Sequence, residues 1–211
     1  MNKLNLSDPN NFLKPTPFLD YKAQSVADFI AKYRGDGNAF DQALNLYYAV
    51  RDKISYNPHR IDLSVAGLCA SKCIELRRGW CVNKAVVYAA CCRAIGVPAV
   101  LGYADVKNHI TTPKLQAKMG SDVFYWHSYA MVYLNGNWVK ATPAFNERLC
   151  NKFGIIAAEF NGVDDSIFLP FNKAGDKHME YLNFRGEYTD LPLANILDTY
   201  QTLYPNLLSV K

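Results

Sequence analysis

Apolar residues in the first quarter of the chain recur at helical spacing. One run stops at the Gly35-Asp36-Gly37 turn and comprises Val26, Phe29, Ile30 and Tyr33. A second run of this kind extends from about Ala39 to Lys53. Because apolar residues three and four positions apart share one face of a helix, the pattern predicts two amphipathic helices that cover the core.

The central segment predicts a buried helix followed by a buried strand. Good helix formers run from Val82 to Ile95 and end at Gly96 and Pro98, which is a normal helix stop. Val97 to Tyr103 is apolar enough for a buried strand. The flanking segments predict less regular structure: a loop at 57–68, a short helical piece around Cys69 and Cys73, and a polar excursion at 104–121.

The strongest local signal is a β-hairpin. Phe124 to Leu134 alternates and is rich in strand-forming residues, and a second strand follows from Asn137 to Thr142. Asn135-Gly136 lies between them. This dipeptide favours a two-residue hairpin turn because both of its positions tolerate a positive φ.

The two ends of the chain carry weaker signals. Residues 1–19 contain three Pro and predict an extended arm that lies on the domain or is partly mobile. Residues 20–211 predict one domain, with central motifs at about 45–146 and a C-terminal extension at 147–211. In that extension we expect a strand at Ser166–Leu169 and a terminal helix near Leu193–Tyr204.

Composition excludes several classes of protein. With 211 residues, 50% of them hydrophobic, the chain can bury one sizeable core. The formal charge of +4 comes from 23 basic and 19 acidic residues scattered along the chain, which does not support binding to nucleic acid or to a membrane surface. The longest apolar runs are far shorter than the ~18 residues of a membrane span, and no signal peptide is visible, so we expect a cytoplasmic protein. Adjacent Cys91 and Cys92 fit reduced thiols better than disulfides.

Cys81 is the strongest candidate for a reactive group. It directly precedes the helix predicted from Val82. A helix start lowers the pKa of a thiol, because unpaired N–H groups and the positive end of the helix dipole favour the thiolate. Gly79 allows a tight approach turn and leaves room for a substrate, and Trp80 is a candidate wall of that site. Other cysteines lack this placement and are interpreted as small buried apolar residues: Cys69, Cys91 and Cys92.

His127 is the candidate base, because the hairpin surrounds it with polar neighbours. The two-residue turn places His127 opposite Ala144. Its diagonal neighbours are Thr142 and Asn146, which share its side of the ribbon. Either could accept a hydrogen bond from the second ring nitrogen, as a catalytic imidazole requires. The histidines of loops and tail are interpreted as structural: His59, His109 and His178.

Four motifs in this order resemble the transglutaminase-like superfamily. They are Val50-Arg51-Asp52-Lys53-Ile54-Ser55-Tyr56, Arg78-Gly79-Trp80-Cys81 with the helix after it, Cys92-Arg93-Ala94-Ile95-Gly96-Val97-Pro98-Ala99, and His127 followed by Tyr-Leu-Asn-Gly-Asn-Trp-Val. The resemblance covers about residues 45–146. It implies an α+β, papain-like fold with N-terminal helices and a nucleophile helix packed on an antiparallel sheet. It also implies acyl transfer through a thioester by a Cys-His-Asp triad, with Cys81 as nucleophile and His127 as base.

The third position departs from this family. Members carry an Asp before a Pro on the returning strand, and here Thr142 precedes Pro143. A neutral hydroxyl stabilises an imidazolium less than a carboxylate does, since charge-assisted hydrogen bonds are roughly twice as strong. Thr142 is favoured by its position. Asn146 could instead complete a Cys-His-Asn arrangement like that of papain-like proteases.

These residues predict a cysteine-dependent hydrolase or acyl transferase that acts on a peptide, a protein or a small amide and needs no cofactor. Hydrolysis is favoured over crosslinking, because the additional β-domains and calcium sites of the large animal transglutaminases have no counterpart here. The alternative is a transglutaminase-like domain that has lost catalysis and serves as a binding or scaffold module.

Three further interpretations are weaker. An arylamine acetyltransferase would carry a glycine-rich nucleophile segment that is not matched here. A zinc site from Cys69, Cys73, Cys81 and His127 has loose CxxxC spacing and no second close ligand pair. Polar and aromatic residues of the tail could line a cleft, but they are interpreted as ordinary surface: Asp164, Asp165, His178, Tyr181 and Tyr188.

Overall fold

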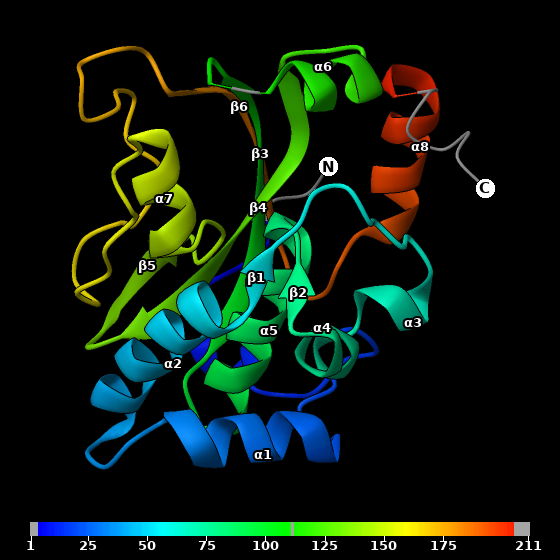
Figure 1. Cartoon of the computed structure of the whole chain (residues 1–211). Coiled ribbons are helices and arrows are strands. Elements are labelled where there is room, and N and C mark those ends of the chain that lie inside the picture. The colour runs from blue at the N-terminus through cyan, green and yellow to red at the C-terminus, as the bar shows by residue number, and fades with distance from the viewer. Residues whose placement is uncertain (1–3, 111, 205–211) are drawn as a thin grey trace.

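A four-stranded antiparallel sheet forms the centre of the computed structural model, which describes residues 4–110 and 112–204. Within these ranges its strands are ordered β5-β4-β3-β6 (Figure 1). They are β3 (Ala99–Asn108), β4 (Val123–Leu134), β5 (Asn137–Ala141) and β6 (Met179–Tyr188). β4 and β5 form the predicted hairpin, in which Leu134 pairs with Asn137. The register expected from the Asn-Gly turn is therefore confirmed as far as the last pair, Ala130 with Ala141.

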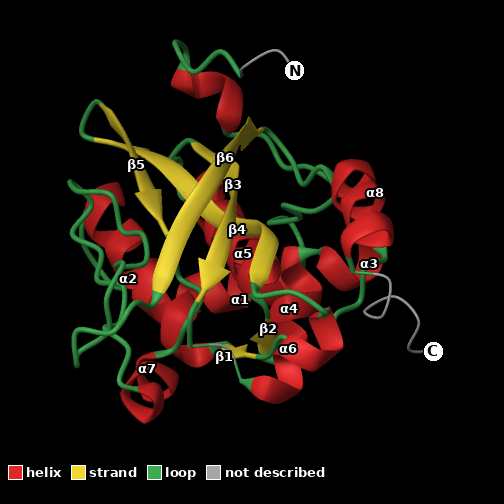
Figure 2. Ribbon diagram, turned by 90° about the horizontal axis from the view of Figure 1, so that it is seen from above, coloured by secondary structure: helices red, strands yellow, loops and turns green. Residues whose placement is uncertain are grey.

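The helix α5 (Cys81–Ala94) packs against β3 and β4 and is buried along its length from Cys81 to Arg93. The helix is buried on all sides and lies in the core, where its polar residues Asn83, Lys84 and Arg93 donate hydrogen bonds to backbone carbonyls. Three further helices surround it: α1 (Gln24–Tyr33), α2 (Ala39–Lys53) and α4 (Ala70–Leu76). Of these, α2 and α4 contact α5 directly. Figure 2 shows the strands lying on one side of this helical layer.

The predicted ends of α1 and α2 follow from local interactions. The Asn38 side chain accepts a hydrogen bond from the Asp41 N–H, and the Asp41 carboxylate accepts one from the Asn38 N–H. This capping box starts α2 at Ala39, as the sequence predicts. α1 ends just before Gly35, whose φ of +67° suits a residue without a side chain.

Several elements differ from the sequence-based expectation. β3 continues through Asn108, and α6 (Pro113–Met119) follows, so the expected polar excursion is mostly regular structure. The expected loop at 57–68 contains α3 (Val65–Leu68). Ser166 forms an isolated bridge with Ala141, and no described residue extends it into the expected strand. The tail contributes α7 (Glu147–Phe153) and β6, which the sequence did not reveal because β6 is a largely exposed edge strand.

Both ends of the chain pack onto this framework. The Trp138 indole N–H donates to the Leu6 carbonyl at 3.2 Å, and Phe12 of η1 (Pro9–Phe12) lies edge-on to the same indole. α8 (Leu193–Leu203) contacts β4 and lies beside the sheet in Figure 1, coloured red. β1 (Ser55–Tyr56) and β2 (Arg78–Gly79) pair in parallel just before α5. Expectations for residues 1–3, 111 and 205–211 lie outside the described residues.

Candidate active site

The Cys81 thiol lies in the first turn of α5. Trp80 is the N-cap residue, and its side chain makes no capping hydrogen bond. Burial raises the pKa of the Cys81 thiol to about 11, although the nearby backbone N–H groups of Ser128, Val82 and Cys81 itself lower it. In this conformation the sulfur is therefore a neutral thiol near pH 7.

Gly79 serves the packing of α5 and does not line the cavity that holds the thiol. Its carbonyl accepts from the Asn57 N–H at 2.9 Å. A Cβ at this position would lie 2.7 Å from Cβ of Asn83 and 2.8 Å from Sγ of Cys73. Gly79 lies in β2 and makes no turn of its own, since the left-handed residue before this strand is Arg77, with a φ of +49°. The space that the glycine provides is occupied by these two side chains rather than left for a substrate.

His127 lies on β4 directly after a shift in the β3–β4 register. Ala104 pairs with His127, whereas the next pair joins Val106 and Phe124. The imidazole packs against aromatic rings, with centroid distances of 5.2 Å to Phe168 and 6.4 Å to Tyr181. These rings hold the imidazole in an apolar environment.

Burial lowers the pKa of His127 to about 4, because the imidazolium would lose its hydration there. Nε2 is buried, and no described residue provides it with a hydrogen-bond partner. The imidazole is therefore neutral at pH 7. The resting pair consists of a thiol and a neutral imidazole, and one proton transfer between them would create the nucleophile.

Thr142 is fully buried directly after the end of β5. Its backbone N–H donates to the Ser166 carbonyl at 2.9 Å, and its own carbonyl accepts from the Tyr47 hydroxyl at 3.1 Å. The Thr142 hydroxyl has no hydrogen-bond partner among the described residues. It lies close enough to the Tyr181 hydroxyl to lower the pKa of that phenol, which burial raises more strongly, although the two groups do not reach hydrogen-bond geometry.

Asn146 is directed away from His127. Its Oδ1 accepts from the Tyr56 N–H at 2.7 Å, and its Nδ2 donates to the carbonyls of Arg51 and Ile54. The expectation that Asn146 neighbours the imidazole assumed that β4–β5 pairing continues beyond Ala141, but the ladder ends there. In this structure the Asn146 amide joins the start of α7 to the end of α2.

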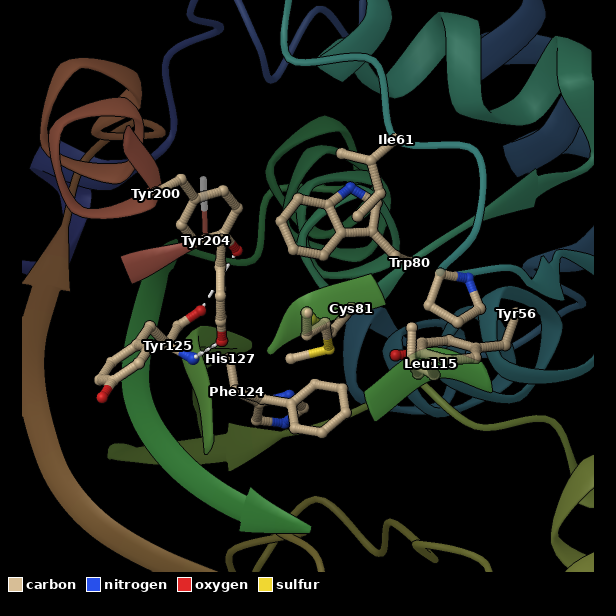
Figure 3. Close-up of a pocket in the computed structure, with 12 residues that line it drawn as sticks. Tyr56, Ile61, Trp80, Cys81, Leu115, Phe124, Tyr125, His127, Tyr200 and Tyr204 are labelled. Carbon is tan, nitrogen blue, oxygen red and sulfur yellow. Dashed lines mark hydrogen bonds between the residues drawn. The ribbon is translucent and has the colours of Figure 1, made fainter. Parts of the chain in front are cut away.

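Cys81 and His127 line one cavity of about 30 Å³ (Figure 3). Such a volume holds about one water molecule. No residue that lines it carries a formal charge, and most are aromatic or aliphatic, among them Tyr56, Trp80, Met119, Phe124, Tyr200 and Tyr204. Cys81 is only 4% exposed. An acyl group can therefore reach the sulfur only after part of this cover moves.

Sequence reasoning missed most of the cover and one neighbour of the imidazole. Tyr200 lies on α8 and Tyr204 is the C-cap residue of this helix, and the Tyr200 ring is 6.2 Å from that of Trp80. The available signal was their spacing, since residues four apart share a helix face. Nothing in the sequence indicated which strand that face would meet. Tyr181, expected at the surface, contacts His127 from β6.

The remaining cysteines and histidines form no comparable arrangement within the described residues. All six cysteines are free thiols. Burial raises the pKa of the Cys73 and Cys92 thiols to about 12. No three His, Cys, Asp or Glu side chains of the described residues are grouped to hold a metal ion. No helix in the same ranges has both the length and the apolar character needed to cross a membrane.

Comparisons with known proteins place the chain in a family. The chain belongs to the transglutaminase-like superfamily, whose family model matches residues 25–143. Its structure is similar to that of a proposed cysteine protease from Cytophaga hutchinsonii, with a TM-score of 0.51 and 17% sequence identity. The match covers 88% of this chain and 55% of that protein, so the chain spans little more than half of its length. No curated protein matches the sequence. The expected papain-like and transglutaminase-like α+β fold is thus confirmed.

Proposed function

We propose that the protein is a cysteine-dependent hydrolase or acyl transferase that acts on amides, with Cys81 as nucleophile and His127 as base. One observation carries the proposal: a thiol at the start of a buried helix shares a cavity with a histidine, within a transglutaminase-like fold. The substrate class is an amide of a peptide, a protein or a small molecule.

In the proposed reaction the imidazole takes the proton of the Cys81 thiol as Sγ attacks the amide carbonyl carbon. The C–N bond then breaks, the imidazolium gives its proton to the leaving amine, and a thioester remains. Water or a second amine then attacks the thioester carbonyl carbon with the imidazole as base. The C–S bond breaks, the carboxylic acid or the new amide leaves, and the imidazolium returns the proton to Sγ. The Cys81 N–H is the natural donor to the oxyanion, and the Ser128 N–H, which faces the sulfur at rest, is a candidate second donor.

A binding or scaffold module without catalysis is the second candidate. Three observations favour it: the resting thiol and imidazole are both neutral, the cavity holds about one water, and Thr142 replaces the family's Asp. A neutral pair lacks the ion-pair activation that makes such thiols reactive.

Labelling with iodoacetamide separates the two candidates. Peptide mass spectrometry would follow all six cysteines between pH 6 and pH 9, and the buried Cys73, Cys91 and Cys92 provide internal controls. For an enzyme, Cys81 is labelled faster than these three, and the excess rate disappears in His127→Gln. Hydrolysis of a panel of fluorogenic acyl amides should then be lost in Cys81→Ala. Labelling of Cys81 as slow as that of the buried controls, with no hydrolysis, would establish the module instead.

A further inference from the structure

The register shift before His127 is a β-bulge. Between the pairs Ala104–His127 and Val106–Phe124, the single residue Asp105 on β3 faces two residues on β4, Tyr125 and Trp126. Trp126 has a φ of +60°, which a bulky residue rarely adopts. Such a conformation costs on the order of 1 kcal/mol and persists only where the surroundings impose it.

Side chains, rather than a neighbouring strand, satisfy the backbone of this bulge. The Trp126 N–H donates to Oδ1 of Asp105 at 3.2 Å. The Tyr125 N–H donates to the Tyr204 hydroxyl at 2.8 Å, and the Tyr125 carbonyl accepts from the Tyr200 hydroxyl at 3.2 Å. The bulge therefore depends on one carboxylate of β3 and two phenols of α8.

The Asp105 carboxylate is itself held by β6. Arg185 Nε donates to Oδ1 at 2.6 Å, and Asn183 Nδ2 donates to Oδ2 at 3.4 Å. The Arg185 guanidinium also lies over the Trp126 indole, 4.6 Å from its centroid. The indole N–H donates to the Thr199 hydroxyl of α8 at 2.9 Å. Trp126 is thus fixed at its backbone, at its ring face and at its ring nitrogen.

Asp105 is only 6% exposed, yet it does not line the cavity that contains Cys81. Burial of a carboxylate costs desolvation free energy, which its hydrogen bonds must offset. Here those bonds fix the conformation of the residue directly before His127. Since side chains of successive strand residues point to opposite faces, a bulge decides the direction of the next side chain.

We propose that Asp105 is a positioning residue for His127: by accepting the Trp126 N–H while bound to Arg185, it fixes the bulge that aims the imidazole at the cavity of Cys81. The inference rests on the proposed function, because only there does the direction of the imidazole matter. Asp105 acts through the backbone and touches neither the thiol nor the imidazole's reacting atoms. Tyr200 and Tyr204 of α8 support the same bulge.

The test compares Asp105→Asn with a matched control, Asp20→Asn. Asp20 also accepts from a backbone N–H, that of Ser71 at 3.0 Å, but in α4 and outside the cavity lining. The readouts are the ring NMR signals of His127 in histidine-labelled protein, assigned with His127→Gln, and the His127-dependent rate of Cys81 labelling by iodoacetamide. Asp105→Asn should shift the His127 ring signals and lower that rate about tenfold, since small misplacements of catalytic groups have effects of this size. Asp20→Asn should change neither.

Unchanged His127 signals and an unchanged labelling rate in folded Asp105→Asn would overturn the inference. If that variant does not fold, Arg185→Lys decides, because Arg185 is partly exposed and the change keeps the charge while removing the planar contact with Trp126. Its His127 signals should shift in the same direction, and no shift would overturn the inference. A wild-type labelling rate that does not depend on His127 would instead contradict the proposed function, while the ring signals would still report on positioning.

Discussion

Two regions that border α5 differ in whether their buried polar groups have hydrogen-bond partners. Towards α2, the fully buried Lys84 ammonium donates to the carbonyls of Arg51 and Ile54, both at 2.8 Å. The Asn146 amide donates to the same two carbonyls. Towards β4, the buried Nε2 of His127 has no partner among the described residues, and neither has the hydroxyl of Thr142.

This difference separates polar groups that hold the fold together from polar atoms that the fold leaves unpaired. Lys84 meets carbonyls at the C-terminal end of α2, where the helix dipole favours a cation. Burial still lowers its pKa to about 7, so the hydrogen bonds hold a group whose charge is expensive to bury. An unsatisfied buried polar atom such as Nε2 of His127 costs about 1–3 kcal/mol and stabilises nothing in the resting fold. Under the proposed function, a bound substrate would complete the hydrogen bonds of this atom.

The largest effect is expected at Lys84, in the region where the buried polar groups are hydrogen-bonded. Lys84→Ala should lower the free energy of unfolding by about 4 kcal/mol, because it leaves a cavity and removes donors from two buried carbonyls. Urea titration followed by circular dichroism measures this change. Lys84→Met keeps the packing of the aliphatic stem and should lose clearly less. A loss below about 1 kcal/mol in Lys84→Ala would show that Asn146 alone satisfies these carbonyls.

The second prediction concerns the pH dependence caused by His127. Its pKa is about 4 in the folded protein and about 6.5 in an unfolded chain. Between pH 4 and pH 6.5 the imidazole binds a proton in the unfolded chain but not in the folded protein. The contribution of His127 to the free energy of unfolding is therefore fully present above pH 6.5 and is lost as the pH falls towards 4. From pH 8 to pH 5 this linkage should remove about 2 kcal/mol from the free energy of unfolding.

His127→Gln provides the control for this titration, because it removes the imidazole and keeps the other titrating groups. The difference between wild type and variant, measured by urea titration at pH 8 and pH 5, isolates the contribution of His127. A difference that stays constant with pH would mean that the imidazole titrates normally. It would then be solvated or paired in the folded protein, and the contrast with Lys84 would fail.

The same contrast explains what the sequence could predict. The start of α5, the capping box of α2 and the β4–β5 hairpin follow from neighbouring residues, so Cys81 and His127 could be located without a structure. The cover of the cavity arises from contacts between distant segments, as when Tyr200 on α8 meets Tyr125 on β4. Such contacts leave no periodic signal. The bulge that precedes His127 is likewise decided by Asp105 on another strand.

The same limit affected the choice of a third residue. The hairpin register predicts both Thr142 and Asn146 as neighbours of His127, but it could not show that pairing stops at Ala141, one residue before Thr142. Beyond that point the position of Asn146 depends on the end of α2, which binds its amide. Tertiary hydrogen bonds thus direct the Asn146 amide away from His127, which strand geometry alone could not predict.

The smallest effect is expected for Thr142→Val, and it is a gain in stability rather than a loss. Valine has nearly the shape of threonine and no hydroxyl to leave unpaired, so the free energy of unfolding should rise by about 1 kcal/mol. Thr16→Val is the matched control, because the Thr16 hydroxyl donates to Asp190 at 2.7 Å and accepts from the Leu19 N–H at 3.0 Å. That variant should lose about 1 kcal/mol. Urea titration of both variants tests the two signs together. If Thr142→Val is destabilised as much as Thr16→Val, the Thr142 hydroxyl has a hydrogen-bond partner in solution.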